Sequence, residues 1–99
     1  MKVVIAEAAW EDMLEICRTI GLDSPRRAET FLEELYDRCI KLGDMPAAFP
    51  LTPGYEQQGI RRRPFGNYLI FYRIGTEAVE ILHVVHGARD YDQILSSKT

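Results

Sequence analysis

The sequence predicts a single α+β domain spanning residues 1–99, with an N-terminal strand, an antiparallel two-helix hairpin and a C-terminal three-stranded meander in a small, mainly antiparallel sheet. Two observations predict this class. A short Val/Ile run precedes two helical apolar repeats, and three apolar runs after residue 59 are separated by glycine-containing turns. The 46% hydrophobic and 27% charged residues are typical of a globular protein, so a packed core is expected.

The first strand is expected over Lys2 to Ala6, and the first helix from about Glu7 to Gly21, because a glycine often ends a helix. Apolar residues recur at helical spacing along this segment, at Ala9, Met13, Ile16 and Ile20. Acidic residues between them are predicted to face outward, namely Glu11, Asp12 and Glu15.

The second helix is predicted to begin at Ser24-Pro25, an N-cap followed by proline at the first helical position, and to stop at Gly43. Its apolar face consists of Ala28, Phe31, Leu32, Leu35, Cys39 and Leu42. Each helix is too hydrophobic on one side to stand alone, so the two should form an antiparallel hairpin.

An ordered, proline-rich loop is expected over residues 44–59, followed by three strands. Their predicted bounds are Ile60 to Phe65, Tyr68 to Ile74 and Ala78 to His86, with turns at Gly66-Asn67 and Gly75-Thr76. The middle strand is apolar on both faces. The helices can cover one face, and the other is expected to need a ligand or a partner chain. A short helix over 90–95 and a frayed tail over 96–99 complete the prediction.

Several function classes are excluded by composition. No stretch approaches the roughly 20 apolar residues that cross a bilayer, and the apolar run before Glu7 is too short for a signal peptide, so a soluble cytoplasmic protein is expected. Cys17 and Cys39 fall on the apolar helix faces and are expected to be reduced core thiols. Two Cys and two His without finger-like spacing predict neither a metal site nor a bound cofactor.

Charge is divided unevenly along the chain, whose net charge is −3. Residues 1–59 hold six Lys/Arg against eleven Asp/Glu, and residues 60–99 hold six against four. The positive charge of the second part is chiefly Arg61, Arg62, Arg63, Arg73 and Arg89. A net-acidic protein gains little from counterion release, so strong autonomous nucleic-acid binding is not expected.

Three segments in this order, "AEAAWEDMLEI", "IRRRPFGNYLIFYRI" and "VEILHVVHGARD", resemble the RelE/ParE superfamily of bacterial toxins over almost the whole chain. The "NYLIFYRI" strand and the "HGARD" ending look more like the ParE branch. That resemblance implies the toxin of a type II toxin–antitoxin pair that poisons DNA gyrase. It also implies a ParD-like ribbon-helix-helix antitoxin as partner in a hetero-oligomer.

Two other functions remain open from the sequence. A RelE-like, ribosome-dependent mRNA endoribonuclease would use His86 as base or acid, with Arg63, Arg73 and Arg89 on the phosphate. The third is a non-toxic member that survives as an antitoxin-binding module.

Against the ribonuclease, RelE-type sites use lysine and arginine clusters, whereas all three lysines of this chain lie outside the meander. Those sites also carry a tyrosine a full helical turn beyond the last arginine. Tyr91 is only two residues beyond Arg89 and is flanked by Asp90 and Asp92, which would repel a phosphate. No catalytic residue is therefore expected.

Protein binding is the expected role of the charged meander. The candidates for antitoxin or target contact are Arg61, Arg63, Tyr72, Arg73, His86 and Arg89. An acidic amphipathic segment could pair with these arginines. For His86 a purely structural role is an equal alternative, and His83 and Trp10 are expected to serve packing. Since residues 61–63 alternate between faces, at least one arginine must point to the covered side. It is expected to need a carboxylate partner, either from the acidic helices or from an acidic antitoxin tail.

Overall fold

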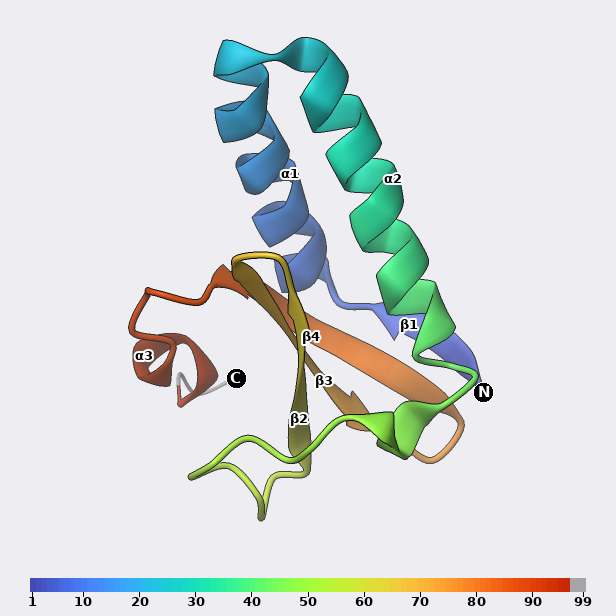
Figure 1. Cartoon of the computed structure of the whole chain (residues 1–99). Helices are drawn as coiled ribbons and strands as arrows, with labels where there is room; N and C mark the ends of the chain where they lie inside the picture. The colour runs from blue at the N-terminus through green and yellow to red at the C-terminus, as the bar shows by residue number, and fades with distance from the viewer. Residues whose placement is uncertain (97–99) are drawn as a thin grey trace.

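A two-helix hairpin stands on one face of a four-stranded sheet in the computed structural model, which describes residues 1–96 (Figure 1). The strand order across the sheet is β1-β4-β3-β2. The elements are β1 (Lys2–Ile5), α1 (Glu7–Asp23), α2 (Pro25–Lys41), the 3₁₀ turn η1 (Pro46–Ala48), β2 (Ile60–Phe65), β3 (Tyr68–Ile74), β4 (Ala78–His86) and α3 (Asp92–Leu95). This architecture confirms the predicted fold class.

Strand β4 lies between the first and third strands of the chain. It pairs in parallel with β1 and antiparallel with β3, and β3 pairs antiparallel with β2, which confirms the meander. The β2–β3 turn is Gly66-Asn67 as predicted, with Gly66 at φ 57° where glycine is favoured. The β3–β4 connection lies between Ile74 and Ala78, as the predicted strand bounds require, and Glu77 follows the Gly75-Thr76 turn in it.

The first helix extends past Gly21 to Asp23, so the predicted end at the glycine is wrong. The chain turns instead at Ser24, whose Oγ accepts the Arg27 N–H at 3.1 Å and caps α2. Gly21 faces the partner helix, since a Cβ placed there would lie 3.6 Å from the Cβ of Ala28. That distance is an ordinary van der Waals contact, so Gly21 lies at the contact between the two helices near their turn without being required there.

The main core lies between the hairpin and the sheet. Its fully buried members from the helices include Met13 and Leu35, and those from the sheet include Ile70, Tyr72 and Ile81. Asp12, predicted to face outward, instead contacts the sheet: its carboxylate accepts the Val84 N–H at 2.9 Å and lies 3.0 Å from His83 Nδ1. Its position on α1 turns it toward β4, so the outward prediction is wrong for this residue. The structural role predicted for His83 is confirmed.

The second face of the sheet is covered by the chain itself. Phe71 is fully buried beneath Tyr55, Tyr91 and α3, with Tyr91 at 5.0 Å from the Phe71 ring. The predicted need for a ligand or partner at this point is therefore wrong, because the segment after β4 folds back over the sheet (Figure 1). The predicted C-terminal helix is confirmed as α3; of the tail predicted to fray, residues 97–99 lie outside the described part of the chain.

The proline-rich loop is ordered along the outer edge of β2. Leu51 bridges to Arg61, the Arg62 N–H donates to Pro50 O at 3.1 Å, and the Thr52 N–H donates to Ile60 O at 2.7 Å. Two residues beyond Arg62, Pro64 has no N–H to offer on the same edge. The loop and the proline together leave β2 a poor template for a further strand.

No helix in residues 1–96 is long and apolar enough to cross a membrane. Both cysteines are free thiols, Cys17 partly buried and Cys39 fully buried, in agreement with the prediction.

Burial raises the pKa of the Cys39 thiol from 9.0 to about 12, although the Arg63 guanidinium acts in the opposite direction. The unfolded chain can ionise this thiol and the folded chain resists it. The protonated thiol therefore makes its full contribution to the free energy of unfolding below pH 9. That contribution falls by about 1.4 kcal/mol for each pH unit as the pH rises from 9 toward 12. Urea unfolding from pH 8 to 11 measures the slope. Cys39→Ala should show a shallower decline, and an equal slope in both proteins would contradict the assignment.

Tyr91→Phe should loosen the cover over the second face. The change removes the 2.9 Å hydrogen bond from Arg62 to the phenol oxygen but keeps the ring that packs on Phe71. We expect a loss of about 1 kcal/mol and faster amide exchange in α3. Tyr36→Phe removes a phenol oxygen from the outer side of the hairpin and is the matched control, expected to leave both measurements unchanged. Equal exchange in α3 of all three proteins would refute the role given to Tyr91.

Candidate functional site

Arg61 and Arg63 form a cationic surface on the helix side of β2. They pair across the strand with Tyr72 and Ile70, which belong to the core beneath the hairpin. Arg61 donates to Phe49 O at 2.7 Å, and the Arg63 guanidinium lies 5.0 Å from the centre of the Phe49 ring. We call Arg61, Arg63 and Phe49 the arginine surface.

The arginine surface has no internal counter-charge. Within residues 1–96 neither guanidinium lies at ion-pair distance from a carboxylate. Within that range the acidic helices therefore do not supply a carboxylate to any arginine of the 61–63 run, and an antitoxin segment is the predicted source that stays open. A backbone carbonyl and an aromatic face stabilise the two cations instead, without neutralising them. Both charges remain available to an anionic partner.

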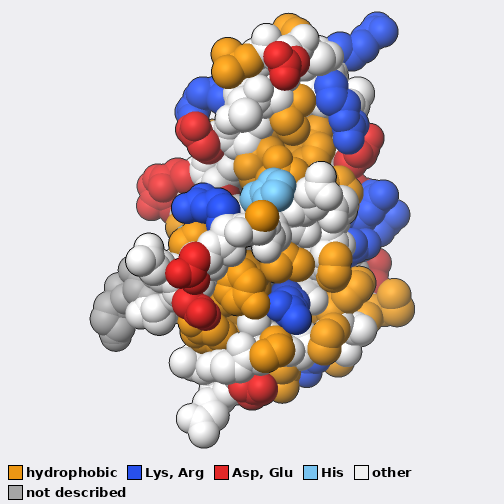
Figure 2. All heavy atoms as spheres, turned by 60° about the vertical axis from the view of Figure 1, so that its left-hand side comes forward, with side chains coloured by type: hydrophobic (Ala, Val, Ile, Leu, Met, Phe, Trp, Pro, Cys, Tyr) orange, Lys and Arg blue, Asp and Glu red, His pale blue; other side chains and the backbone are white. Residues whose placement is uncertain are grey.

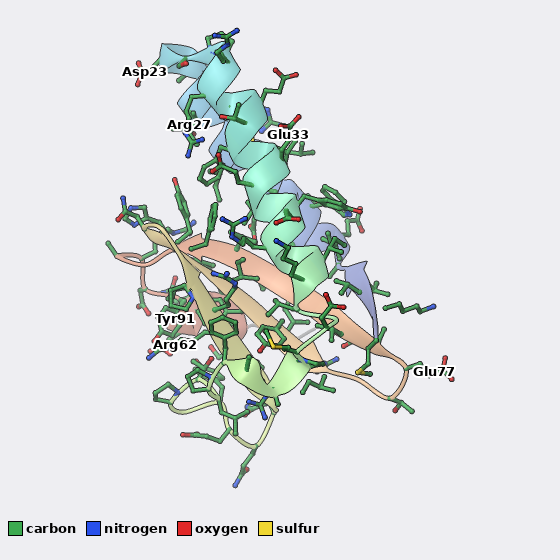
Figure 3. All side chains as sticks on the ribbon, turned by 45° about the vertical axis from the view of Figure 1, so that its right-hand side comes forward. Asp23, Arg27, Glu33, Arg62, Glu77 and Tyr91 are labelled. Carbon is green, nitrogen blue, oxygen red and sulfur yellow. The ribbon has the colours of Figure 1, made fainter. Side chains whose placement is uncertain are left out.

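Arg62 and Arg73 lie on the other face of the sheet. Arg62 reaches Tyr91, and Figure 3 shows the two side chains next to each other. Arg73 donates to Glu80 on the neighbouring strand at 2.7 Å. It also lines a groove of about 520 Å³ with apolar residues of the second face, among them Ile60, Leu82 and Ile94. Arg73 thus belongs to a different surface from Arg61 and Arg63.

Tyr72 supports the arginine surface from beneath. Its side chain is fully buried, and its phenol donates to Pro46 O at 2.6 Å, which ties β3 to η1. Burial raises the pKa of this phenol in spite of the nearby Arg61 guanidinium, so the group stays protonated and remains a donor. In this conformation Tyr72 can position a contact surface but cannot itself touch a partner.

His86 and Arg89 come together at the end of β4, as their spacing suggested. Both line an open cavity of about 180 Å³ between α1 and the sheet. Figure 2 shows a histidine beside a basic side chain, with hydrophobic side chains above and below it, on the face it presents. The same cavity carries the carboxylates of Asp12 and Glu15, so its charge is mixed.

The hydrogen bonding of His86 restricts its chemistry. Its Nδ1 accepts the Ala88 N–H at 3.1 Å, and its ring stands edge-on to Tyr68 with the ring centres 5.3 Å apart. When neutral, such an imidazole carries its proton on Nε2 and has no free lone pair for a base. The side chain can donate a hydrogen bond to a partner.

The four residues proposed for a ribonuclease are not assembled into one site. Arg73 is on the opposite face from Arg63, as their registers show. Arg63 and His86 share a face, but β3 separates their strands, which at ordinary strand spacing is roughly 10 Å. The rings of Phe65 and Tyr68 lie on this face at the His86 end, each about 5.5 Å from Phe31.

Sequence reasoning missed two contributors to these surfaces. Phe49 holds both cations of the arginine surface, and no local pattern marks a phenylalanine in a proline-rich loop for that role. Asp12 lies at the His86 cavity and binds β4. The signal that could have found Asp12 was its place one residue before Met13, toward the side of the helix that packs on the sheet.

Comparison with known proteins agrees with this architecture. Residues 3–91 match the family model described as the ParE toxin of the type II toxin–antitoxin system parDE. A solved structure of the chromosomal ParDE TA system from P. aeruginosa shares the fold, with a TM-score of 0.74 at 17% sequence identity, covering 87% of this chain and 95% of that chain. Comparison with curated proteins gives no match.

The family match spans nearly the whole domain, including the hairpin, the arginine surface and the His86 end of β4. The solved structure shares the fold of this chain, in which the N-terminal strand belongs to the four-stranded sheet. The chain therefore belongs to the family of ParE toxins of type II toxin–antitoxin systems.

Proposed function

We propose that this toxin inhibits growth by binding DNA gyrase in the cytoplasm and that a ParD-like ribbon-helix-helix antitoxin neutralises it. The observation that carries the proposal is the ParE family match over residues 3–91. Members of the ParE branch act by holding a target protein, and this needs a shaped and charged surface more than a catalytic group.

The arrangement of polar residues favours this reading over an RNA-cleaving one. Metal-independent RNA cleavage needs a base at the 2′-hydroxyl and cations around one phosphate. Arg73 is on the other face of the sheet, and the Nδ1 of His86 is occupied by the Ala88 N–H. Asp12 and Glu15 would also repel a phosphate at the His86 cavity.

The arginine surface is the proposed contact for the antitoxin. Arg61 and Arg63 lie on one face of an edge strand and have no carboxylate partner within residues 1–96. An acidic segment laid along this face would form charge-assisted hydrogen bonds with both guanidinium groups. Its apolar side chains could pack beside the Phe49 ring. The backbone edge of β2 is already occupied by the loop, so side chains would provide most of the recognition.

Purified toxin is expected to inhibit DNA supercoiling by gyrase and to accumulate the cleaved-DNA complex. A supercoiling assay on relaxed plasmid, followed by denaturation to reveal cleaved DNA, measures both effects. Ribosomes programmed with mRNA should leave that mRNA intact under the same conditions. Inactivity toward gyrase at micromolar toxin would contradict the proposal. Ribosome-dependent cleavage that disappears in His86→Ala and Arg89→Ala would establish the RelE-like alternative, and absence of growth arrest without antitoxin would favour the non-toxic one.

Arg61→Gln combined with Arg63→Gln should weaken antitoxin binding by about 10- to 100-fold, because each change removes a cation facing a carboxylate. Calorimetric titration of the toxin with the acidic C-terminal segment of the adjacent-gene antitoxin measures this at two salt concentrations. The double variant should also lose most of the salt dependence. The control is Arg26→Gln in the first turn of α2, which is exposed and distant from β2. Equal affinities for both variants would place the antitoxin elsewhere.

A further inference from the structure

Four large apolar side chains are exposed together on the outer side of the helical hairpin. They are Trp10 and Leu14 of α1 and Tyr36 and Ile40 of α2, with exposed fractions of 38%, 47%, 44% and 40%. We call these four residues the hairpin patch. The fully buried residues of the same helices, such as Met13 and Leu35, pack toward the sheet, so the patch lies apart from the core.

The hairpin patch is one continuous surface. Trp10 and Leu14 are four residues apart on one helix, and Tyr36 and Ile40 are four apart on the other, so each pair lies on one face. The Trp10 and Tyr36 rings join the two helices, with their centres 6.0 Å apart and their planes at 24°. The sequence-based expectation that Trp10 serves packing is therefore only half met, because this packing is itself at the surface.

The composition of the patch is that of a recognition surface. Exposed apolar residues that lie singly need no explanation, but a contiguous group with a stacked Trp–Tyr pair resembles the centre of a protein interface. Other exposed large apolar residues among those described lie elsewhere, for example Leu22 at the hairpin turn and Ile74 at the end of β3. Figure 1 shows the hairpin projecting beyond the sheet, which leaves its outer side open.

Acidic side chains border the patch on both helices. Each lies three or seven residues from a member of the patch, and therefore on the same side of its helix. They are Glu7 and Glu11 on α1 and Glu29 and Glu33 on α2. None of the four forms an ion pair with another described residue, whereas Glu15, Glu34 and Asp37 are each paired with a basic neighbour. In Figure 3, Glu33 stands on α2 well clear of the sheet.

We propose that the hairpin patch is a second docking surface, for an amphipathic helix of a partner protein whose apolar stripe is bordered by Lys or Arg. A third helix can pack its apolar stripe across the exposed apolar faces of two antiparallel helices. Its basic flanks would face the four unpaired glutamates. This surface is opposite in charge to the arginine surface and does not depend on the proposed gyrase or antitoxin contacts.

The negative charge of the four glutamates that border the hairpin patch, called here the acidic rim, distinguishes between possible binding partners. A second copy of this chain would bring one acidic rim against another, and that repulsion disfavours a symmetric dimer through the patch. An acidic segment would also be repelled by the four glutamates that border the hairpin patch. The acidic partner proposed for the arginine surface therefore does not fit the hairpin patch.

The patch contains its own probe, because Trp10 is the sole tryptophan of the sequence. Two synthetic helical peptides with the same leucine stripe, one flanked by lysine and one by glutamate, are titrated into the full-length toxin while Trp10 emission is followed. We expect the lysine-flanked peptide to shift Trp10 emission to the blue and to bind at least about tenfold more tightly than the glutamate-flanked one.

Three double variants locate the effect. Glu11→Gln with Glu33→Gln should weaken the lysine-flanked peptide about tenfold, whereas Asp23→Asn with Glu77→Gln, which removes the same charge elsewhere, should change it less than about twofold. Leu14→Ser with Ile40→Ser alters only exposed positions, so the fold should survive while the emission shift is lost. Circular dichroism checks that each variant is folded.

Three results would overturn the proposal. The first is an unchanged Trp10 emission with both peptides, and the second is equal affinity of the two double charge variants for the lysine-flanked peptide. The third is a concentration-dependent blue shift without peptide, accompanied by a dimer in sedimentation, which would make a second copy the occupant. None of these results bears on gyrase inhibition or antitoxin binding, which are measured separately.

Discussion

Burial of β3 on both faces is the constraint on which the rest of this structure depends. Ile70 and Tyr72 point to one side of the strand and Phe71 to the other, and all three are inaccessible to solvent. A single hairpin can cover only one side of a sheet, so a second cover is required. Tyr55, Tyr91 and α3 provide it from the loop and from the segment after β4. The small domain thus builds a second core without recruiting another molecule.

This two-sided burial also distributes the arginines. Alternation along β2 sends Arg61 and Arg63 to the hairpin side and Arg62 to the α3 side, where it bonds to the phenol of Tyr91. Arg73, beside Tyr72, is directed to the α3 side as well and pairs with Glu80. Of these four cations only Arg73 is neutralised by a carboxylate, and Arg61 and Arg63 are the two that lie together on the hairpin side with their charge unpaired within residues 1–96. These two therefore offer an acidic partner two adjacent unpaired charges on one face.

Much of the fold could be predicted from the sequence, because hydrophobic period, glycine turns and a Ser-Pro cap are local signals that tertiary packing reinforced. The failures involve information that is not local. Gly21 does not end α1, because the helix continues to Asp23 and the chain turns at Ser24, whose side chain caps the next helix. Asp12 resembles its solvated neighbours in the sequence, yet β4 supplies the donors that hold it. For the site, the arginines could be predicted from the sequence as candidates for partner contacts. The fold alone reveals that Phe49 contacts both Arg61 and Arg63, and that Arg73 lies on the opposite face of the sheet.

The position of β4 affects how the protein is made. This strand joins β1 to β3, yet it is synthesised after both helices of the hairpin and after all three of the other strands. Until it emerges from the ribosome, β1 has no neighbouring strand and β3 has only β2, whereas the hairpin can form from local contacts alone. A chain terminated before Ala78 would consist of a helical hairpin and an isolated strand pair. The ribosome must therefore finish synthesising β4 before the arginine surface and the hairpin can be held in one rigid body. A message cut short of β4 yields no complete toxin.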